Sequence, residues 1–378
     1  MTTPVERPAG RLQRTTTAET VVTGRVFLLN SAKYGDPPPA FLSATRSGLV
    51  VCGPGAQNRI AEIGGASIPL MADPGAYTRE PLATADVPLA LPDSYGSLFG
   101  DALDTVLQEQ RDRGATAAIV PARYVPAGDS AALKALVARA QSIERDDVIV
   151  AVPVAIAWLK DRQFLSQLIA LLKRIPHPKA IMFGQQHNPF DTAKATINFR
   201  RLVGETPSVG LWRADFLAAF DCLAYGGAFA AIGAGGSLRH LVPADEPGQG
   251  RSGTPSVLLP EQLVYTTGKV LADRYANAPA PRCSCQVCDG ASLDRFNTKA
   301  PEARIEAFAH NAAIWTERLA ELFDHETAAD RQRWWRGVCQ TALDAQALEN
   351  ARLGQANAYK ASPHLKALAS LSLPGEPQ

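Results

Sequence analysis

The sequence has no long hydrophobic run. No apolar stretch in its 378 residues reaches the roughly 18 residues that a membrane-spanning helix requires. Residues 1–20 are polar and lack the apolar core of a secretory signal, so they are expected to form a flexible lead. Cysteine is also scarce, with six residues in the whole chain, which excludes a disulfide-built scaffold and favours the reducing cytoplasm. The sequence therefore predicts a cytoplasmic protein with no membrane partner.

A charge excess and a dinucleotide-binding motif are missing as well. Lys plus Arg (38) and Asp plus Glu (37) nearly cancel, so the total charge does not indicate a nucleic-acid partner, although a local basic patch stays open. No G-x-G-x-x-G turn opens a helix after the first expected strand, and "GAGGS" at 233–237 comes late in the chain. A dinucleotide site is therefore not predicted.

The middle of the chain alternates short apolar segments with amphipathic helical stretches at 130–144, 161–175 and 215–227. Several apolar segments show no polar alternation, which is typical of strands buried on both faces. Repeated strand–helix units predict an α/β protein with a parallel sheet, either open and doubly wound or closed into a (β/α)8 TIM-type barrel. We favour the barrel over residues 21–276, with an N-terminal elaboration. The expected strands are 66–75, 116–125, 146–155, 178–186, 207–215 and 226–236.

In such a barrel the chemistry lies at the carboxyl ends of the strands. A polar residue that closes a strand is, taken alone, more typical of a helix cap or a loop hydrogen bond. Several such residues on one face of a barrel are site candidates together. The sequence places six there: Asp73, Arg123, Gln185, Gln186, Arg213 and Asp215.

The pattern changes after Gly236. Residues 242–256 form a long loop rich in Pro, Gly and Ser, and "NAPAP" at 277–281 is a second hinge. From Glu302 the chain is strongly helical. We expect a helical subdomain over 277–360 and a tail over 361–378, and the sequence leaves open whether the tail is ordered.

Three of the six cysteines fall within "CSCQVC", and His310 follows in a predicted helix. Cys283, Cys285, Cys288 and His310 make a closed tetrahedral zinc shell, so one structural zinc per chain is predicted. A redox motif would be an isolated C-x-x-C, and an iron–sulfur cluster would need a fourth nearby cysteine. Two alternatives stay open: His310 as an ordinary helix-surface histidine, and Asp289 as a substitute ligand.

A barrel followed by C-x-C-x2-C and a helix with His-Asn at 310–311 resembles the tRNA-guanine transglycosylase superfamily. Its members are zinc-containing barrels that exchange guanine for a 7-deazaguanine in tRNA or, in some relatives, in DNA. The resemblance implies a nucleic-acid partner (tRNA or DNA) and a 7-deazaguanine-type base. It also makes the zinc subdomain a candidate dimer interface, with a second copy or with another subunit.

Two further segments resemble the family. "MADPGAY" is similar to its Asp-Ser-Gly-Gly/Ala-aromatic turn, with Pro74 in place of Ser. This implies Asp73 as the general base, Gly75 in the turn and Tyr77 as the ring that stacks on the base. "IMFGQQ" is similar to the strand whose backbone reads the heterocycle, which implies the same role for Gly184.

At two positions the chain departs from the family pattern. Ile232 stands where the nucleophilic Asp is expected, although a carboxylate is needed to attack the ribose and hold the strand covalently. Arg123 stands where a base-recognising Asp is expected, and it would suit a more electron-rich ligand or a phosphate. Asp215 is the replacement candidate for the nucleophile, and a helix N-cap is its equally supported alternative. Asp221 is less suitable because it lies within a predicted helix.

Two classes of function remain. One is an enzyme that exchanges guanine for a 7-deazaguanine base with Asp73 as general base. The other is a non-catalytic accessory or nucleic-acid-binding relative that has lost the nucleophile; direct hydrolysis of an N-glycosidic bond is a weaker third. "RQRWWR" at 331–336 combines arginines with tandem tryptophans. It could contact nucleic acid, although helix packing by Trp334 or Trp335 is the favoured interpretation.

Overall fold

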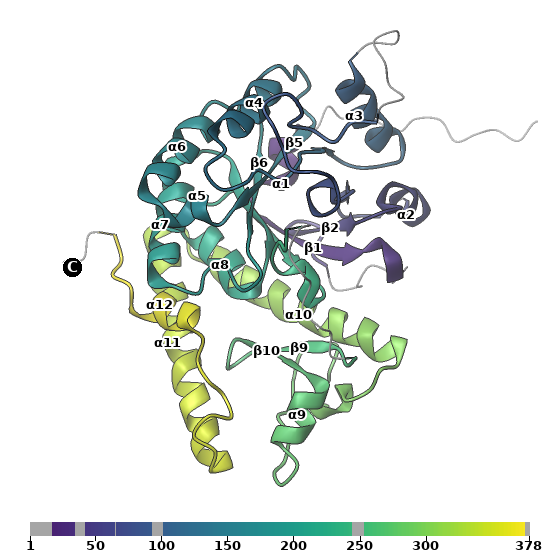
Figure 1. Cartoon of the computed structure of the whole chain (residues 1–378). Coiled ribbons are helices and arrows are strands. Elements are labelled where there is room, and N and C mark those ends of the chain that lie inside the picture. Colours follow the sequence, from purple (N-terminus) through teal and green to yellow (C-terminus); the bar gives the residue numbers. More distant parts are fainter. Residues whose placement is uncertain (1–16, 35–41, 65, 93–100, 244–252, 375–378) are drawn as a thin grey trace, which may run out of the picture.

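Eight parallel strands form the centre of the protein in the computed structural model, which describes residues 17–34, 42–64, 66–92, 101–243 and 253–374 (Figure 1). They lie in the order β3-β2-β1-β8-β7-β6-β5-β4. The strands are β1 (Arg25–Ser31), β2 (Ser47–Cys52), β3 (Leu70–Asp73), β4 (Ala118–Val120), β5 (Val148–Ala155), β6 (Lys179–Gly184), β7 (Val209–Ala214) and β8 (Phe229–Gly233).

The two outer strands of this order, β3 and β4, face each other and nearly close the sheet. Just before β4, the Thr116 N–H donates to the Leu70 carbonyl oxygen at 2.7 Å, and its Oγ1 accepts from the Leu70 N–H at 3.0 Å. Because consecutive parallel strands are joined through helices and the ends meet, the fold is a TIM-like α/β barrel. The predicted fold class is confirmed.

The six expected strands correspond to β3–β8, with longer predicted ranges than the observed ones. The sequence pattern did not predict β1 or β2. These two strands are almost wholly buried, and β1 pairs with β2 on one side and with β8 on the other. Segments 25–31 and 47–52 therefore supply the first quarter of the barrel, where only an elaboration was expected.

Helices follow most strands, and side-chain caps begin many of them. Asp101, Asp129, Asp161, Thr192 and Asp215 each accept a backbone N–H bond at a helix start. Such caps satisfy donors that the first turn leaves unpaired. The helices around the sheet are α1 (Ala18–Val22), α2 (Ala56–Ile63), α3 (Ala102–Asp112), α4 (Ser130–Gln141), α5 (Ala157–Lys160), α6 (Arg162–Leu172), α7 (Ala193–Glu205) and α8 (Phe216–Ala224).

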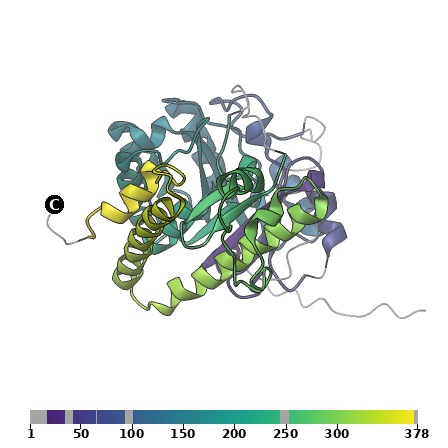
Figure 2. The same cartoon turned by 90° about the horizontal axis from the view of Figure 1, so that it is seen from below.

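The C-terminal third lies below the barrel in Figure 1, and α10 and α11 cross in front of it in Figure 2. Trp335 of α11 is fully buried, with its ring 5.9 Å from Phe216 and 5.6 Å from Phe220 of α8. It therefore packs the helices together, as the favoured interpretation of the tandem tryptophans predicted. The elements are β9 (Ser256–Leu259), β10 (Val264–Thr267), α9 (Gly268–Arg274), α10 (Pro301–Asp324), α11 (Ala328–Leu353) and α12 (Pro363–Ser370).

The predictions for the N-terminal lead, the long loop and the C-terminal tail can be compared with the structure only in part. Residues 1–16 of the expected lead, and 244–252 of the long loop, lie outside the described residues. The expected tail contains α12, whose His364 ring stacks on Phe190 at 5.2 Å. Within the described ranges, no helix combines the length and the apolar character needed to cross a membrane.

Lys179, the first residue of β6, is 2% exposed and donates to the Ile175 carbonyl oxygen at 3.0 Å. Burial lowers the pKa of Lys179 to about 8, and Glu19 opposes this only in part. An unfolded chain binds this proton up to about pH 10.4. Between about pH 8 and about pH 10.4 the unfolded state binds more protons at Lys179 than the folded state does. The free energy of unfolding of the wild-type protein should therefore rise with pH in this range.

We therefore expect Lys179→Met to gain stability relative to wild type below pH 8, and to lose that advantage as the pH rises to about 10. Urea unfolding of both proteins at pH 7 and pH 10 measures the difference. Lys173→Met, at an exposed ion pair with Glu205, is the control and should show no such trend. A difference for Lys179→Met that stays constant with pH would contradict the prediction.

Candidate functional site

Asp73 lies at the carboxyl end of β3 and is 2% exposed. Its Oδ1 accepts the Gly75 N–H at 2.9 Å, which the left-handed conformation of Gly75 (φ +67°) brings into place. Its Oδ2 accepts the Tyr77 hydroxyl at 2.5 Å and the indole N–H of Trp212 at 3.1 Å. Three donors thus hold this carboxylate in one orientation.

Tyr77 connects Asp73 to a cation. Its hydroxyl accepts from Arg213 Nε at 2.8 Å, and the Arg213 guanidinium lies 5.0 Å from the centre of its ring. Burial raises the pKa of Tyr77 well above its usual value, so the hydroxyl stays protonated and donates to Asp73. The ring is 2% exposed, so in this conformation Tyr77 offers no open shelf on which a base could stack.

A bulge in β7 brings two consecutive side chains to this cluster. Leu211 pairs with Ala230 of β8 but Ala214 pairs with Ile232, so β7 has one residue more than its partner strand. Arg213 takes a left-handed conformation (φ +54°) within the bulge. Neighbouring side chains of a regular strand point to opposite faces, and the bulge removes this alternation. Trp212 reaches Asp73 and Arg213 reaches Tyr77 for this reason.

Asp215 belongs to a different set of contacts. It caps α8 by accepting the Ala218 N–H at 2.9 Å, and it accepts from Asn188 Nδ2 at 3.3 Å. Burial raises its pKa, against the opposing effects of the cap bonds and of Arg239. No hydrogen bond or ion pair joins it to Asp73 in the described part of the chain. The helix-cap alternative for Asp215 is therefore what the geometry shows.

Ile232, at the position of the expected nucleophile, is fully buried in β8. It pairs with Leu28 of β1 and Ala214 of β7. Asp221, the less suitable carboxylate, is 1% exposed and pairs with Arg200 between α8 and α7. Neither side chain is placed to attack a sugar.

The remaining candidates lie at the same end of the sheet. Tyr124 covers Gly184, since a Cβ on this glycine would lie 2.4 Å from the Tyr124 ring. Gln185 accepts from Lys160 Nζ at 3.1 Å and donates to the Asn188 carbonyl oxygen at 3.3 Å. It therefore shares Asn188 with Asp215. Arg123 has a buried Nε without a hydrogen-bond partner among the described residues.

The metal-site prediction corresponds to a compact group of donors. The ligand atoms of Cys283, Cys285, Cys288 and His310 all lie within 4.8 Å of one another, and all four residues are buried. His310 Nδ1 lies 3.5 Å from Cys285 Sγ and 3.2 Å from Cys288 Sγ. Three sulfurs and one imidazole nitrogen at these separations fit a tetrahedral metal shell without an open position. Asp289 is not part of this group.

The His-Asn pair of α10 fixes the cluster to the hairpin β9–β10. His310 Nε2 bonds the Leu258 carbonyl oxygen at 2.8 Å, which leaves Nδ1 facing the sulfurs. Asn311 Oδ1 accepts the Leu258 N–H at 2.7 Å, and its Nδ2 donates to the Ser256 carbonyl oxygen at 3.0 Å. Arg295 Nη2 lies 3.1 Å from Cys288 Sγ, where it can stabilise a thiolate. The His-Asn pair was part of the family resemblance, but its contacts with β9 and the position of Arg295 were not predicted.

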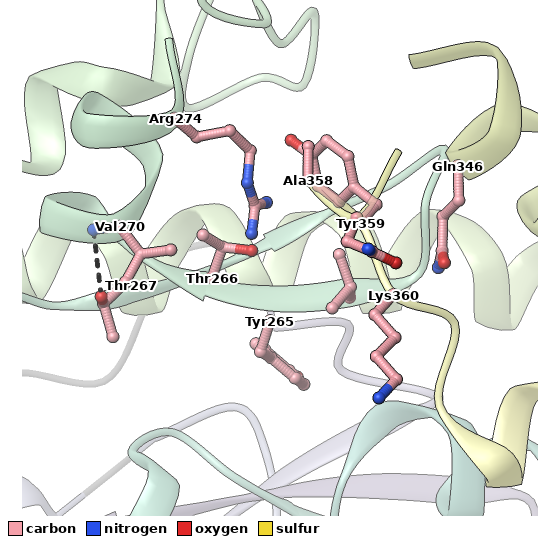
Figure 3. Close-up of a pocket in the computed structure, with 11 residues that line it drawn as sticks. Tyr265, Thr266, Thr267, Val270, Arg274, Gln346, Ala358, Tyr359 and Lys360 are labelled. Carbon is pink, nitrogen blue, oxygen red and sulfur yellow. Dashed lines mark hydrogen bonds between the residues drawn. The ribbon is translucent and has the colours of Figure 1, made fainter. Parts of the chain in front are cut away.

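A hollow of about 380 Å³ lies apart from both clusters, between β10, α9, α11 and residues 357–360 (Figure 3). The Arg274 guanidinium lies 4.0 Å from the centre of the Tyr359 ring on one wall. On another wall, Gln346 donates to the Gln262 carbonyl oxygen at 2.7 Å, while its Oε1 has no partner among the described residues. Exposed Lys360 adds a second cation.

Comparison with known proteins gives no family assignment. No protein-family model and no curated protein matches the chain. Among solved structures, the chain is similar to the carboxyl transferase domain of Rhizobium etli pyruvate carboxylase, solved with 3-hydroxypyruvate. The identity is 12% and the TM-score 0.32, over 92% of this chain and 59% of that one.

Proposed function

We propose that this chain is a non-catalytic, transglycosylase-like protein that binds a base of tRNA or DNA at the barrel mouth without forming a covalent intermediate. The observation that carries the proposal is Ile232, which is fully buried in β8 at the position where the family resemblance implies a nucleophilic carboxylate. An aliphatic side chain cannot attack C1′ of a ribose. Asp215 does not replace it, because it is engaged at the start of α8.

The state of Asp73 is consistent with binding rather than proton transfer. A general base must reach the proton that it abstracts. Both oxygens of Asp73 already accept hydrogen bonds, and Tyr77 and Trp212 cover Oδ2. In the proposed role, Asp73 holds Tyr77 and, through it, Arg213 in place at the mouth of the barrel.

The metal in this proposal is one structural zinc per chain. The Cys3His donor set is the one that tetrahedral structural zinc uses, and a shell of four protein ligands leaves no position for a reactive water. The zinc would join the "CSCQVC" turn to α10 and, through His310 and Asn311, to β9. The surface around this clip is the candidate contact for a second copy or an active partner subunit.

Incubation with labelled guanine tests the proposal. We expect the wild-type protein to place no label into tRNA or duplex DNA above the level of a no-protein blank, while it retards one of these nucleic acids in a binding assay. Asp73→Asn should leave the labelling result unchanged. The alternative is guanine exchange with Asp73 as base and Asp215 as nucleophile, and labelling that both Asp73→Asn and Asp215→Asn abolish would establish it. Absence of binding to both nucleic acids would also overturn the proposal.

A further inference from the structure

Arg213 is buried, yet most of its hydrogen-bonding capacity is unused. The residue is 9% exposed, and its Nε donates to the Tyr77 hydroxyl. Nε is the only group of this side chain that forms a hydrogen bond with a described residue, so both Nη groups lack a protein partner there. A buried guanidinium group usually pairs with a carboxylate or with several acceptors, because an unpaired charge is costly to bury.

Two half-buried arginines of this protein follow that rule. Arg239 donates from Nε, Nη1 and Nη2 to the Gly233 carbonyl oxygen, the Ser256 hydroxyl and the Ala234 carbonyl oxygen, at 3.0 to 3.1 Å. Arg200 donates from Nε and Nη2 to Asp221, at 2.8 to 3.2 Å. Arg213 differs because its Nε alone is hydrogen-bonded to a described residue.

The position of the Arg213 side chain depends on a strained backbone. A non-glycine residue at φ +54° costs about 1–2 kcal/mol, and the bulge in β7 interrupts its ladder with β8. In a regular strand Arg213 would face away from Trp212 and from the Asp73 cluster. Strain that aims one side chain toward the carboxyl ends of barrel strands occurs where ligands bind.

The surroundings of the Nη groups suit an anion. Gly75 lies beside them, since a Cβ at this position would stand 3.7 Å from Nη2, at an ordinary van der Waals distance. Burial lowers the pKa of His240, and the nearby charge of Arg213 lowers it further, so this imidazole is neutral and Arg213 is the cation that an anion would meet. The carboxylate of Asp73 is bonded to Tyr77 and Trp212, so it does not occupy the Nη groups.

We propose that Arg213 binds an anionic oxygen group, either phosphate or carboxylate, through its two Nη groups at the mouth of the barrel. A planar guanidinium forms two parallel hydrogen bonds with such a group, which a lysine ammonium cannot reproduce. The inference deepens the proposed function, since a phosphate of bound nucleic acid is one source of the anion. If the anion is a phosphate of nucleic acid, the inference rests on the proposed function. If the anion belongs to a small carboxylate or phosphate ester, it does not.

Binding of inorganic phosphate and of acetate, followed by calorimetry, tests this site. We expect Arg213→Gln to weaken the binding of at least one of the two probes about 10- to 100-fold, as the loss of charge-assisted hydrogen bonds predicts. Arg213→Lys should lose most of that affinity although it keeps the charge. Circular dichroism and urea unfolding check that the Arg213→Gln and Arg213→Lys variants are folded. Arg201→Gln, at the exposed pair with Glu205, is the matched control.

The two probes distinguish the sources. Arg213-dependent binding of phosphate identifies a phosphate-bearing ligand, and Arg213-dependent binding of acetate identifies a carboxylate. Equal binding by wild type and a folded Arg213→Gln variant, or no binding of either probe, overturns the inference. Guanine labelling of nucleic acid, or a failure to bind it, would remove the proposed function and leave Arg213-dependent anion binding untouched.

Discussion

Cys285→Ser should yield a protein without bound zinc and with an unfolded region around the "CSCQVC" turn. Cys285 is buried and is one of the four donors, and its Sγ lies 3.5 Å from His310 Nδ1. Structural zinc stabilises small domains by about 10–16 kcal/mol, which equals or exceeds the whole stability of a typical domain. Serine leaves an incomplete shell, so the turn loses its connection to α10 and β9.

Two measurements check this result. Metal analysis should find one zinc per wild-type chain and less than half of that in Cys285→Ser. Limited proteolysis should cut the variant, but not wild type, between β9 and the start of α10. Cys339→Ala replaces another fully buried cysteine, in α11 outside the cluster, and should keep both the zinc and the protection. A metal-free Cys285→Ser protein as stable as wild type would show that no zinc clip exists.

Asp221→Asn should lower the free energy of unfolding by about 3 kcal/mol, since breaking a buried ion pair leaves an uncompensated charge. Asp221 is 1% exposed and accepts three hydrogen bonds from Arg200 at 2.8 to 3.2 Å, across the contact between α8 and α7. The Arg200 guanidinium also lies 3.8 Å from the centre of the Tyr225 ring, and its side chain is 10% exposed, so little water reaches it in the variant.

Urea unfolding of wild type and Asp221→Asn measures this loss. Asp273→Asn is the control, because Asp273 forms an exposed pair with Lys269 on α9 and should change stability by less than about 0.5 kcal/mol. A cost for Asp221→Asn no larger than that of the control would mean that this pair does not hold α7 and α8 together. It would also leave Asp221 as a candidate for the nucleophile considered in the sequence analysis.

Most of the barrel was predictable because the apolar pattern of a strand is visible within a short stretch of sequence. Six apolar segments correspond to β3–β8, and amphipathic helical stretches at 130–144, 161–175 and 215–227 follow β4, β5 and β7. The segments of β1 and β2 are just as apolar, but the helix described between them has only three residues (Ala32–Tyr34), and α2 after β2 has only eight. A short buried run without such a context does not distinguish a strand from other buried chain.

The metal cluster was predictable for a similar reason, since the spacing of Cys283, Cys285 and Cys288 is a local property. The barrel mouth was not. Whether Tyr77 is an exposed shelf or a buried donor depends on Asp73 and Arg213, and the position of Arg213 depends on a one-residue bulge between β7 and β8. Trp212, an Asp73 partner that no motif contains, reaches the site through the same bulge. Such pairing is set by tertiary contacts rather than by spacing along the chain.

A search for a covalent adduct tests most directly the claim that the barrel mouth binds without a nucleophile. Wild-type protein is incubated with tRNA and, separately, with duplex DNA, denatured, and its mass determined. We predict the mass of the free chain in every case, for wild type and for Asp215→Asn alike. A protein–nucleic acid adduct in wild type and in Asp273→Asn, but not in Asp215→Asn, would contradict this account and identify Asp215 as the nucleophile.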